Sequence, residues 1–225
     1  MTKIKQIQIL NYFNMLKMFG YNYSKEFIIE EKSSCDFSLP SNNIELREVV
    51  KSCHLCELSK HRKNVLFSSG RINSKIMFIC DEPSKTEDEL GEFYHGNSGE
   101  MLLNMIKNVL KLNKDDIYIT TMLKCRPKFE ASIQNYDSCF CYLSKQIELV
   151  KPKIIVGFGE KVFNYFIKDD GEFLQKRGDV LKYGNFTFIP TFSTQFLLKN
   201  PSYKKDSFED LKKIKTVYEE LIWDI

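Results

Sequence analysis

Short apolar runs alternate with amphipathic segments along most of the chain. Runs that are bounded by polar or turn-forming residues occupy 75–80, 117–121, 153–158 and 186–191. Apolar residues at helical spacing occupy 97–110, 136–150, 161–167 and 206–223. Short buried strands that alternate with helices are typical of parallel sheets covered on both faces. The pattern therefore predicts an α/β fold, with a short, mainly parallel four-stranded central sheet in a three-layer α-β-α arrangement.

The N-terminal part of the chain has a different pattern. Residues 3–20 place apolar side chains at helical spacing and end at Gly20, and residues 30–43 are polar and turn-rich. We therefore expect a helical appendage with a linker over 1–43, in front of an α/β domain over 44–225. Lys and Asn interrupt the apolar residues at the N-terminus, and no stretch approaches 18 apolar residues. A cytoplasmic protein without a membrane span is expected.

Composition narrows the class of protein, and the cysteines add candidate chemistry. The 225 residues are 43% hydrophobic and 28% charged, which excludes a largely disordered chain. The net charge of +3 permits nucleic-acid binding without requiring it. Seven cysteines are many for a reducing compartment, where metal ligation is the natural use. Cys53 and Cys56 form a CxxC pair, which Cys125 with either Cys139 or Cys141 would complete. Spacing leaves zinc, an iron–sulphur cluster and ordinary buried cysteines all open.

Ligands of parallel α/β sheets bind beyond the carboxyl ends of the strands. The loops at that edge are expected at 80–99, 121–130, 158–161 and 191–201. The first loop carries acidic residues that could activate water or simply form a solvated acidic surface, namely Asp81, Glu82, Glu87 and Asp88. It also carries a glycine-rich turn over 91–99 with adjacent aromatic residues, which could approach a planar ligand or cap the core. Residues 197–205 join two leucines to three lysines, as in a wedge inserted into stacked DNA or in a plain loop between helices.

Taken in order, these motifs resemble those of the iron–sulphur uracil-DNA glycosylases, the family-four branch of that superfamily. The resemblance runs from about residue 44 to the C-terminus. The matching segments are Cys53–Leu58 with Arg62–Val65, Cys80–Ser84 with Glu87-Asp88, Gly91–Gly99, Tyr118–Pro127, Cys139, Gln146–Lys153, Arg177-Gly178 and Leu197–Pro201. The resemblance implies DNA as the partner, with no obligate protein partner, and repair by flipping uracil out and hydrolysing its N-glycosidic bond.

The resemblance also implies a role for individual residues. A [4Fe-4S] cluster would be held by Cys53, Cys56, Cys125 and Cys139, with Cys141 two residues out of register. The catalytic positions would be Asp81 for water activation and Ser193 near the leaving base. The base-binding positions would be Tyr94 for stacking, Thr121 at the base edge, and Pro83. DNA contacts would come from Leu197 or Leu198 as the wedge and from Lys199 and Arg126 near phosphates.

Four of these positions differ from the residues of the family. Asp81 replaces Glu, Tyr94 replaces Phe, Thr121 replaces the base-reading Asn, and Ser193 replaces the His that helps the leaving base. One hydroxyl cannot donate and accept at once to a uracil edge as an amide can. Three interpretations therefore compete. The chain is an active glycosylase with altered base preference, a DNA-binding protein without catalysis, or a protein with another activity such as redox sensing on the same scaffold.

Overall fold

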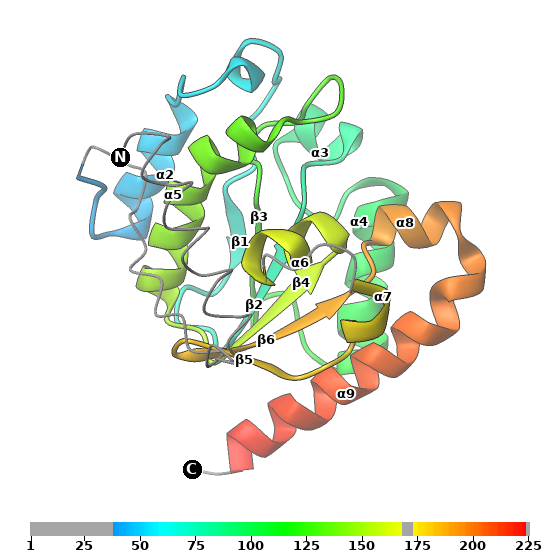
Figure 1. Ribbon diagram of the computed structural model, residues 1–225. Coiled ribbons are helices and arrows are strands. Elements are labelled where there is room, and N and C mark those ends of the chain that lie inside the picture. The colour runs from blue at the N-terminus through cyan, green and yellow to red at the C-terminus, as the bar shows by residue number, and fades with distance from the viewer. Residues whose placement is uncertain (1–37, 168–172, 224–225) are drawn as a thin grey trace, which may run out of the picture. The chain divides into compact units, whose positions relative to one another are not determined.

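A computed structural model describes residues 38–167 and 173–223, and its centre is a six-stranded sheet (Figure 1). The strand order is β1-β3-β2-β4-β6-β5. The four inner strands are parallel and comprise β3 Tyr118–Thr121, β2 Ile76–Cys80, β4 Ile154–Phe158 and β6 Phe186–Thr191. The two edge strands, β1 Ser68–Gly70 and β5 Leu181–Tyr183, are antiparallel to their neighbours.

The register places the carboxyl ends of the four inner strands in one row. Cys80 pairs with Thr121 on one side and with Phe158 on the other, and Phe158 pairs with Thr191. Loops that leave these four residues therefore begin side by side, which is the usual setting of a ligand site in such a sheet.

Helices cover both faces of the sheet. Their bounds are α2 Asn43–Lys51, α3 Lys85–Leu90, α4 Gly96–Asn104, α5 Ile133–Val150, α6 Glu160–Ile167, α7 Phe173–Lys176, α8 Thr194–Lys199 and α9 Lys204–Trp223. A π-helical segment, Met105–Leu110, continues α4, and 3₁₀ turns occupy Glu57–Lys60 and Pro201–Tyr203.

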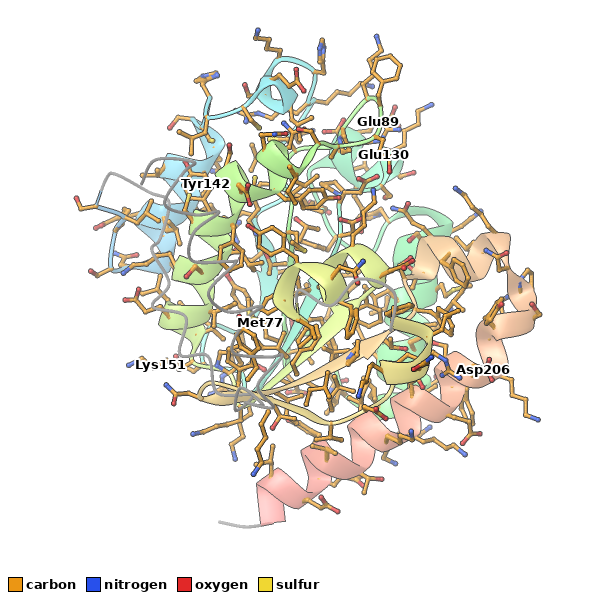
Figure 2. The ribbon with its side chains drawn as sticks, viewed as in Figure 1. Met77, Glu89, Glu130, Tyr142, Lys151 and Asp206 are labelled. Atoms are coloured by element: carbon orange, nitrogen blue, oxygen red, sulfur yellow. The ribbon has the colours of Figure 1, made fainter. Side chains whose placement is uncertain are left out.

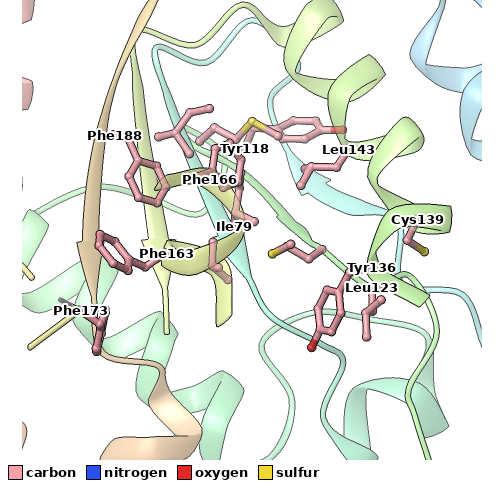
Figure 3. Packing of buried hydrophobic residues seen from close by; sticks show 14 of the residues in the cluster. Ile79, Tyr118, Leu123, Tyr136, Cys139, Leu143, Phe163, Phe166, Phe173 and Phe188 are labelled. Atoms are coloured by element: carbon pink, nitrogen blue, oxygen red, sulfur yellow. The ribbon is translucent and has the colours of Figure 1, made fainter. Parts of the chain in front are cut away.

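Side chains alternate between the two faces along each inner strand, as the pleat of a strand requires. On β2, Met77 and Ile79 pack with residues of α5, α6 and α7, and Figure 3 shows part of this cluster. Ile76 and Phe78 point to the other face and pack with α4, its π-helical continuation and α9. A smaller cluster joins α2 to α5. The sheet is thus the middle layer of three.

The structure confirms the α/β class and all four predicted strands to within one residue at each end. The predicted number of strands is wrong, because the sheet also contains β1 and β5. Each edge strand has only three residues, and Leu181–Tyr183 and Ser68–Gly70 are too short to produce a recognisable apolar alternation. Helix α4 begins at Gly96 rather than after Asn97.

Two expectations on the N-terminal part stay predictions. The helix over 3–20 lies outside the described residues, and the boundary between residues 43 and 44 falls at the start of α2 without being tested by it. Within the described ranges, no helix is long and apolar enough to cross a membrane.

Candidate active site and a four-cysteine cavity

A cavity opens beyond the carboxyl ends of the inner strands. Its walls are formed by Cys80, Asp81, Glu82, Glu87, Phe93, Ser98, Gly99, Leu102, Thr121, Phe158, Ser193, Thr194 and Gln195. In Figure 2, Glu89 and Glu130 mark this end of the sheet, and Lys151, which precedes β4, marks the other. All four predicted loop regions contribute to this edge, with Phe158 as the contribution of the third.

Asp81 follows the last residue of β2, and its carboxylate has two partners. The hydroxyl of Tyr136 donates a hydrogen bond to Asp81 Oδ1 at 2.7 Å. The ammonium of Lys161, on α6, lies 3.9 Å from Asp81 Oδ2. Burial raises the pKa of Asp81 above its ordinary value, and the Tyr136 hydrogen bond and the Lys161 charge offset only part of that rise. Both partners therefore favour an ionised carboxylate at this point of the cavity.

The neighbouring carboxylate, Glu82, behaves differently. Burial and then the charge of Asp81 raise the pKa of Glu82 to about 7, and Lys161 and Arg126 lower it less. The side chain of Glu82 accepts no hydrogen bond like the one that Tyr136 gives to Asp81 in the described part of the chain. Two adjacent carboxyl groups therefore differ in how readily they take up a proton near neutral pH.

Glu87 and Asp88 have structural contacts. Glu87 completes a capping box at the start of α3, since Ser84 N–H donates to Glu87 Oε2 at 3.0 Å. Its other oxygen accepts from Tyr94 N–H at 3.3 Å. Asp88 accepts from the backbone N–H of Lys63 at 3.1 Å. Both carboxylates are buried, so the interpretation as a solvated acidic surface is wrong for them.

The glycine-rich turn places Phe93, rather than Tyr94, on the cavity wall. Tyr94 adopts a φ of +70°, which is unusual for an aromatic residue, and its buried hydroxyl has no hydrogen-bond partner among the described residues. Gly99 makes this turn possible, because a Cβ there would lie 2.4 Å from the carbonyl carbon of Tyr94. The Phe93 and Tyr94 rings lie 6.2 Å apart, centroid to centroid.

Thr121 and Ser193 replace the Asn and His of the family, and both line the cavity. Their hydroxyl oxygens already make hydrogen bonds within the protein. Thr121 is 1% exposed, and its hydroxyl donates to the carbonyl of Leu66 at 3.4 Å. Ser193 is the N-cap of α8 and accepts from Phe196 N–H at 3.2 Å. The hydroxyl proton of Ser193 stays available to a ligand, because capping uses an oxygen lone pair.

The predicted DNA contacts separate into buried and exposed residues. Leu197 is 0% exposed and packs in the core beside α6 and α7, so it is wrong as a wedge. Leu198 is 39% exposed, and Lys199 next to it is also exposed. Arg126 is half-buried, and Pro83 is buried and does not line the cavity. The exposed leucine is therefore the one that can reach a ligand from α8.

A second, smaller cavity lies at the start of α5. Its lining includes Cys53, Cys56, Cys125 and Cys139, but not Cys141, which packs between α2 and α5. The guanidinium of Arg62 donates to Cys125 Sγ at 3.2 Å, and Leu55 N–H donates to Cys53 Sγ at 3.5 Å. Burial raises the pKa of Cys125, and Arg62 opposes this shift. Cationic and N–H donors around thiols are what bound thiolates need.

The four thiols surround this cavity without meeting at one point. Among the described residues, no three His, Cys, Asp or Glu side chains converge as ligands of a single metal ion do. The thiols of the six described cysteines are free. Thiolates on one zinc ion lie about 2.3 Å from the metal and hence close together. A four-iron, four-sulphide cluster is larger than an ion, so four thiols that surround one cavity without converging on a point fit a cluster by the chemistry of the donor set.

Lys124 lines the cavity of the four cysteines and contacts Thr121, which lines the other cavity. It is 1% exposed, and its ammonium donates to the hydroxyl of Thr120 and to the side-chain carbonyl of Gln146, each at 2.6 Å, and to the carbonyl of Thr121. Burial lowers the pKa of Lys124 to about 7, whereas the adjacent thiols of Cys139 and Cys125 raise it. This network fixes the chain between the cavity residue Thr121 and the thiol of Cys125.

Comparison with protein-family models matches residues 67–214 to the uracil DNA glycosylase superfamily. The chain belongs to this superfamily. Among curated proteins it is 34% identical to a type-4 uracil-DNA glycosylase of Sulfurisphaera tokodaii, over 76% of this chain and 82% of the relative. It is 31% identical to the enzyme of that name from Saccharolobus solfataricus, over 77% and 86% of the two chains. It is 30% identical to the type-4 uracil-DNA glycosylase of Thermotoga maritima, over 75% of this chain and 91% of the relative.

In this member of the superfamily, the residues that sequence reasoning missed lie mostly in loops that it had singled out. Phe93, Ser98 and Thr194 belong to the 80–99 and 191–201 regions, and the hydroxyls of Ser98 and Thr194 lie 2.6 Å apart. Tyr136 gave no such signal. Tyr136 is 55 positions from Asp81 in the sequence and lies in a segment whose apolar spacing predicts only a helix packed on the core.

Proposed function

We propose that this chain is a DNA repair glycosylase that hydrolyses the N-glycosidic bond of a base flipped out of DNA, with uracil as the first candidate. The observation that carries the proposal is the pair of partners on Asp81, which favours an ionised carboxylate inside a cavity with aromatic walls. Membership of the superfamily and relatives named type-4 uracil-DNA glycosylases support it.

In the proposed reaction, Asp81 orients a water molecule and takes its proton as the water oxygen bonds to C1′ of the sugar. The C1′–N1 bond breaks, and the base leaves with the bonding electron pair. The hydroxyl of Ser193 donates toward the departing base anion. Glu82, whose pKa is about 7, holds a proton in part of the molecules at neutral pH and is a second donor at this wall.

Base binding is assigned to the aromatic wall and to the end of β3. Phe93 lies on the wall and offers its ring to the flipped base, with Tyr94 behind it. Thr121 faces the base edge, and Pro83 supports the turn from β2 to α3. Thr121 already donates to Leu66, so it offers the base an acceptor oxygen more readily than a donor. A weakened preference for uracil over cytosine is expected.

The proposed DNA surface follows the exposed residues around the cavity. Leu198 takes the role of the wedge, and Lys199 and Arg126 contact phosphates. Residues 44–225 form the glycosylase-like domain in this proposal, and residues 1–43 are an appendage. The chain acts in the cytoplasm, where thiols stay reduced.

A [4Fe-4S] cluster on Cys53, Cys56, Cys125 and Cys139 is part of the proposal, and their shared cavity supports it. When bound, the cluster supplies a cross-link between the segment before β1, the end of β3 and the start of α5. Arg62 places a cation beside these thiols, and Lys124, whose pKa is about 7, lines the same cavity. Loss of the cluster should therefore loosen the segments that hold Thr121 and Tyr136.

A DNA-binding protein without catalysis is the second candidate. The engagement of the Thr121 and Ser193 hydroxyls with Leu66 and Phe196 favours it, since neither side chain replaces the amide or imidazole of the family. Both candidates bind DNA in a salt-sensitive way, and only the first releases a base.

The test is a single-turnover base-release assay, with cluster-loaded protein in excess over labelled oligonucleotides. The oligonucleotides carry uracil, hypoxanthine, xanthine or a thymine mismatch, in single strands and duplexes. Release that Asp81→Asn abolishes, and that the surface variant Glu89→Gln retains, supports the glycosylase. DNA binding without release from any oligonucleotide supports the second candidate instead.

A further inference from the structure

The contact between Tyr136 and Asp81 joins two parts of the sheet edge that are far apart in sequence. Tyr136 lies in the first turn of α5, and Asp81 follows β2. Tyr136 is 6% exposed, and its ring packs against that of Tyr165 at 6.3 Å between centroids. The ring is thus held by the core while its hydroxyl reaches the carboxylate at 2.7 Å. Figure 3 shows the hydroxyl of Tyr136 and the thiol of Cys139 leaving α5 in different directions.

We propose that Tyr136 is the positioning residue of the reaction and that its hydrogen bond holds the carboxylate of Asp81 in one orientation. The proposal rests on the proposed function, because it assigns Tyr136 a role through the water-activating carboxylate. Aspartate replaces the longer glutamate of the family at this position, so the carboxylate has less reach, and a fixed orientation matters more. A small displacement of a reacting group can slow a reaction by about 100-fold.

Tyr136 is the donor in its hydrogen bond with Asp81. Burial and the charge of Asp81 raise the pKa of Tyr136, so its phenol stays protonated and donates at every pH of interest. In the described part of the chain, Asp81 also has Cys80 and Glu82 beside it and Lys161 on α6, and Arg126 and Glu130 from the loop before α5 act on Glu82. Lys161 is 44% exposed and 3.9 Å away, so solvent screens its effect. Tyr136 makes the shorter and more buried contact.

Tyr136→Phe removes this hydroxyl and keeps the ring. Tyr165→Phe is the matched control, because Tyr165 donates to Asp137 at 2.8 Å on the solvent side and packs against the same ring. We expect Tyr136→Phe to slow single-turnover base release by about tenfold or more, with the DNA dissociation constant, melting temperature and visible absorbance of the cluster unchanged. The acid limb of its pH–rate profile should move to higher pH, because the pKa of Asp81 rises without the donor. Tyr165→Phe should match the wild type in all of these.

A double variant tests whether the effect passes through Asp81. Asp81→Asn and the Asp81→Asn/Tyr136→Phe pair should be equally slow, because Tyr136 then has no carboxylate to hold. A Tyr136→Phe rate within twofold of the wild type, or a further tenfold loss in the double variant, overturns the proposal. Absence of release by the wild type overturns the proposed function instead. NMR titration of the Asp81 carboxyl carbon then tests the hydrogen bond from Tyr136 to Asp81. If Tyr136→Phe leaves the pKa of Asp81 unchanged, the proposed role of this hydrogen bond is refuted.

Discussion

Two adjacent leucines on α8 should respond to the same substitution in opposite ways. Leu197 is 0% exposed in the core cluster, and Leu198 is 39% exposed on the same helix, whose first two residues line the cavity. Truncating a buried leucine to alanine costs about 3 kcal/mol of unfolding free energy. For a domain of this size, that loss lowers the melting temperature by about 6–12 °C. Leu198→Ala should change the melting temperature by no more than about 2 °C, because surface substitutions stay within about 0.5 kcal/mol.

The same pair separates DNA binding from folding. Complete burial of a leucine gains about 2 kcal/mol, so inserting the exposed part of Leu198 between bases is worth roughly 1 kcal/mol. Leu198→Ala should therefore weaken binding to a uracil-containing duplex about fivefold at fixed salt, measured by fluorescence anisotropy. Leu197→Ala should bind normally at a temperature where it is folded. Normal melting of Leu197→Ala, or normal affinity of Leu198→Ala, would refute the assignment of core and wedge.

Three further predictions test the site. Thr121→Asn should restore an amide at the base edge and raise the ratio of uracil to cytosine affinity by about tenfold or more, measured by competition binding with single-strand oligonucleotides; an unchanged ratio contradicts the placement of this residue. Cys139→Ser should lose iron and the visible absorbance of the cluster, whereas Cys141→Ser should keep both, and iron analysis of the two purified proteins decides between the ligands. Tyr94→Phe should raise the melting temperature by a few degrees, because it removes a buried hydroxyl without a partner, at a cost of about 1 kcal/mol or more; a lower melting temperature would show that the hydroxyl is satisfied.

The central sheet could be predicted because its inner strands are buried on both faces. Runs such as Ile76–Cys80 and Ile154–Phe158 are apolar throughout, and that composition identifies a strand without any knowledge of its neighbours. The edge strands Ser68–Gly70 and Leu181–Tyr183 are only partly covered and short, so their sequences carry little information on pairing. The alternation of strands and helices along the chain therefore predicts the three layers but not the number of strands in the sheet.

The candidate site was predictable to the level of loops but not of individual side chains. Asp81 and Thr121 lie at strand ends, and the rule for parallel sheets brings such ends together. The choice between Leu197 and Leu198 depends on the rotation of a helix of six residues, which the sequence does not specify. The choice between Phe93 and Tyr94 depends on a left-handed turn at Tyr94 that only the fold around Gly99 explains.

The end of β3 and the start of α5 support both cavities. The cysteines on these two segments can therefore influence the geometry of the reaction site. The end of β3 carries Thr121 on one cavity and, four residues later, Cys125 on the other. The start of α5 carries Tyr136 beside Asp81 and, three residues later, Cys139. A cross-link through the two cysteines would fix both segments at once, so it would hold the base edge and the reacting carboxylate in register without contacting either. A cluster held here would therefore contribute to catalysis through geometry, and its removal should resemble loss of the Tyr136 hydroxyl more than loss of the carboxylate.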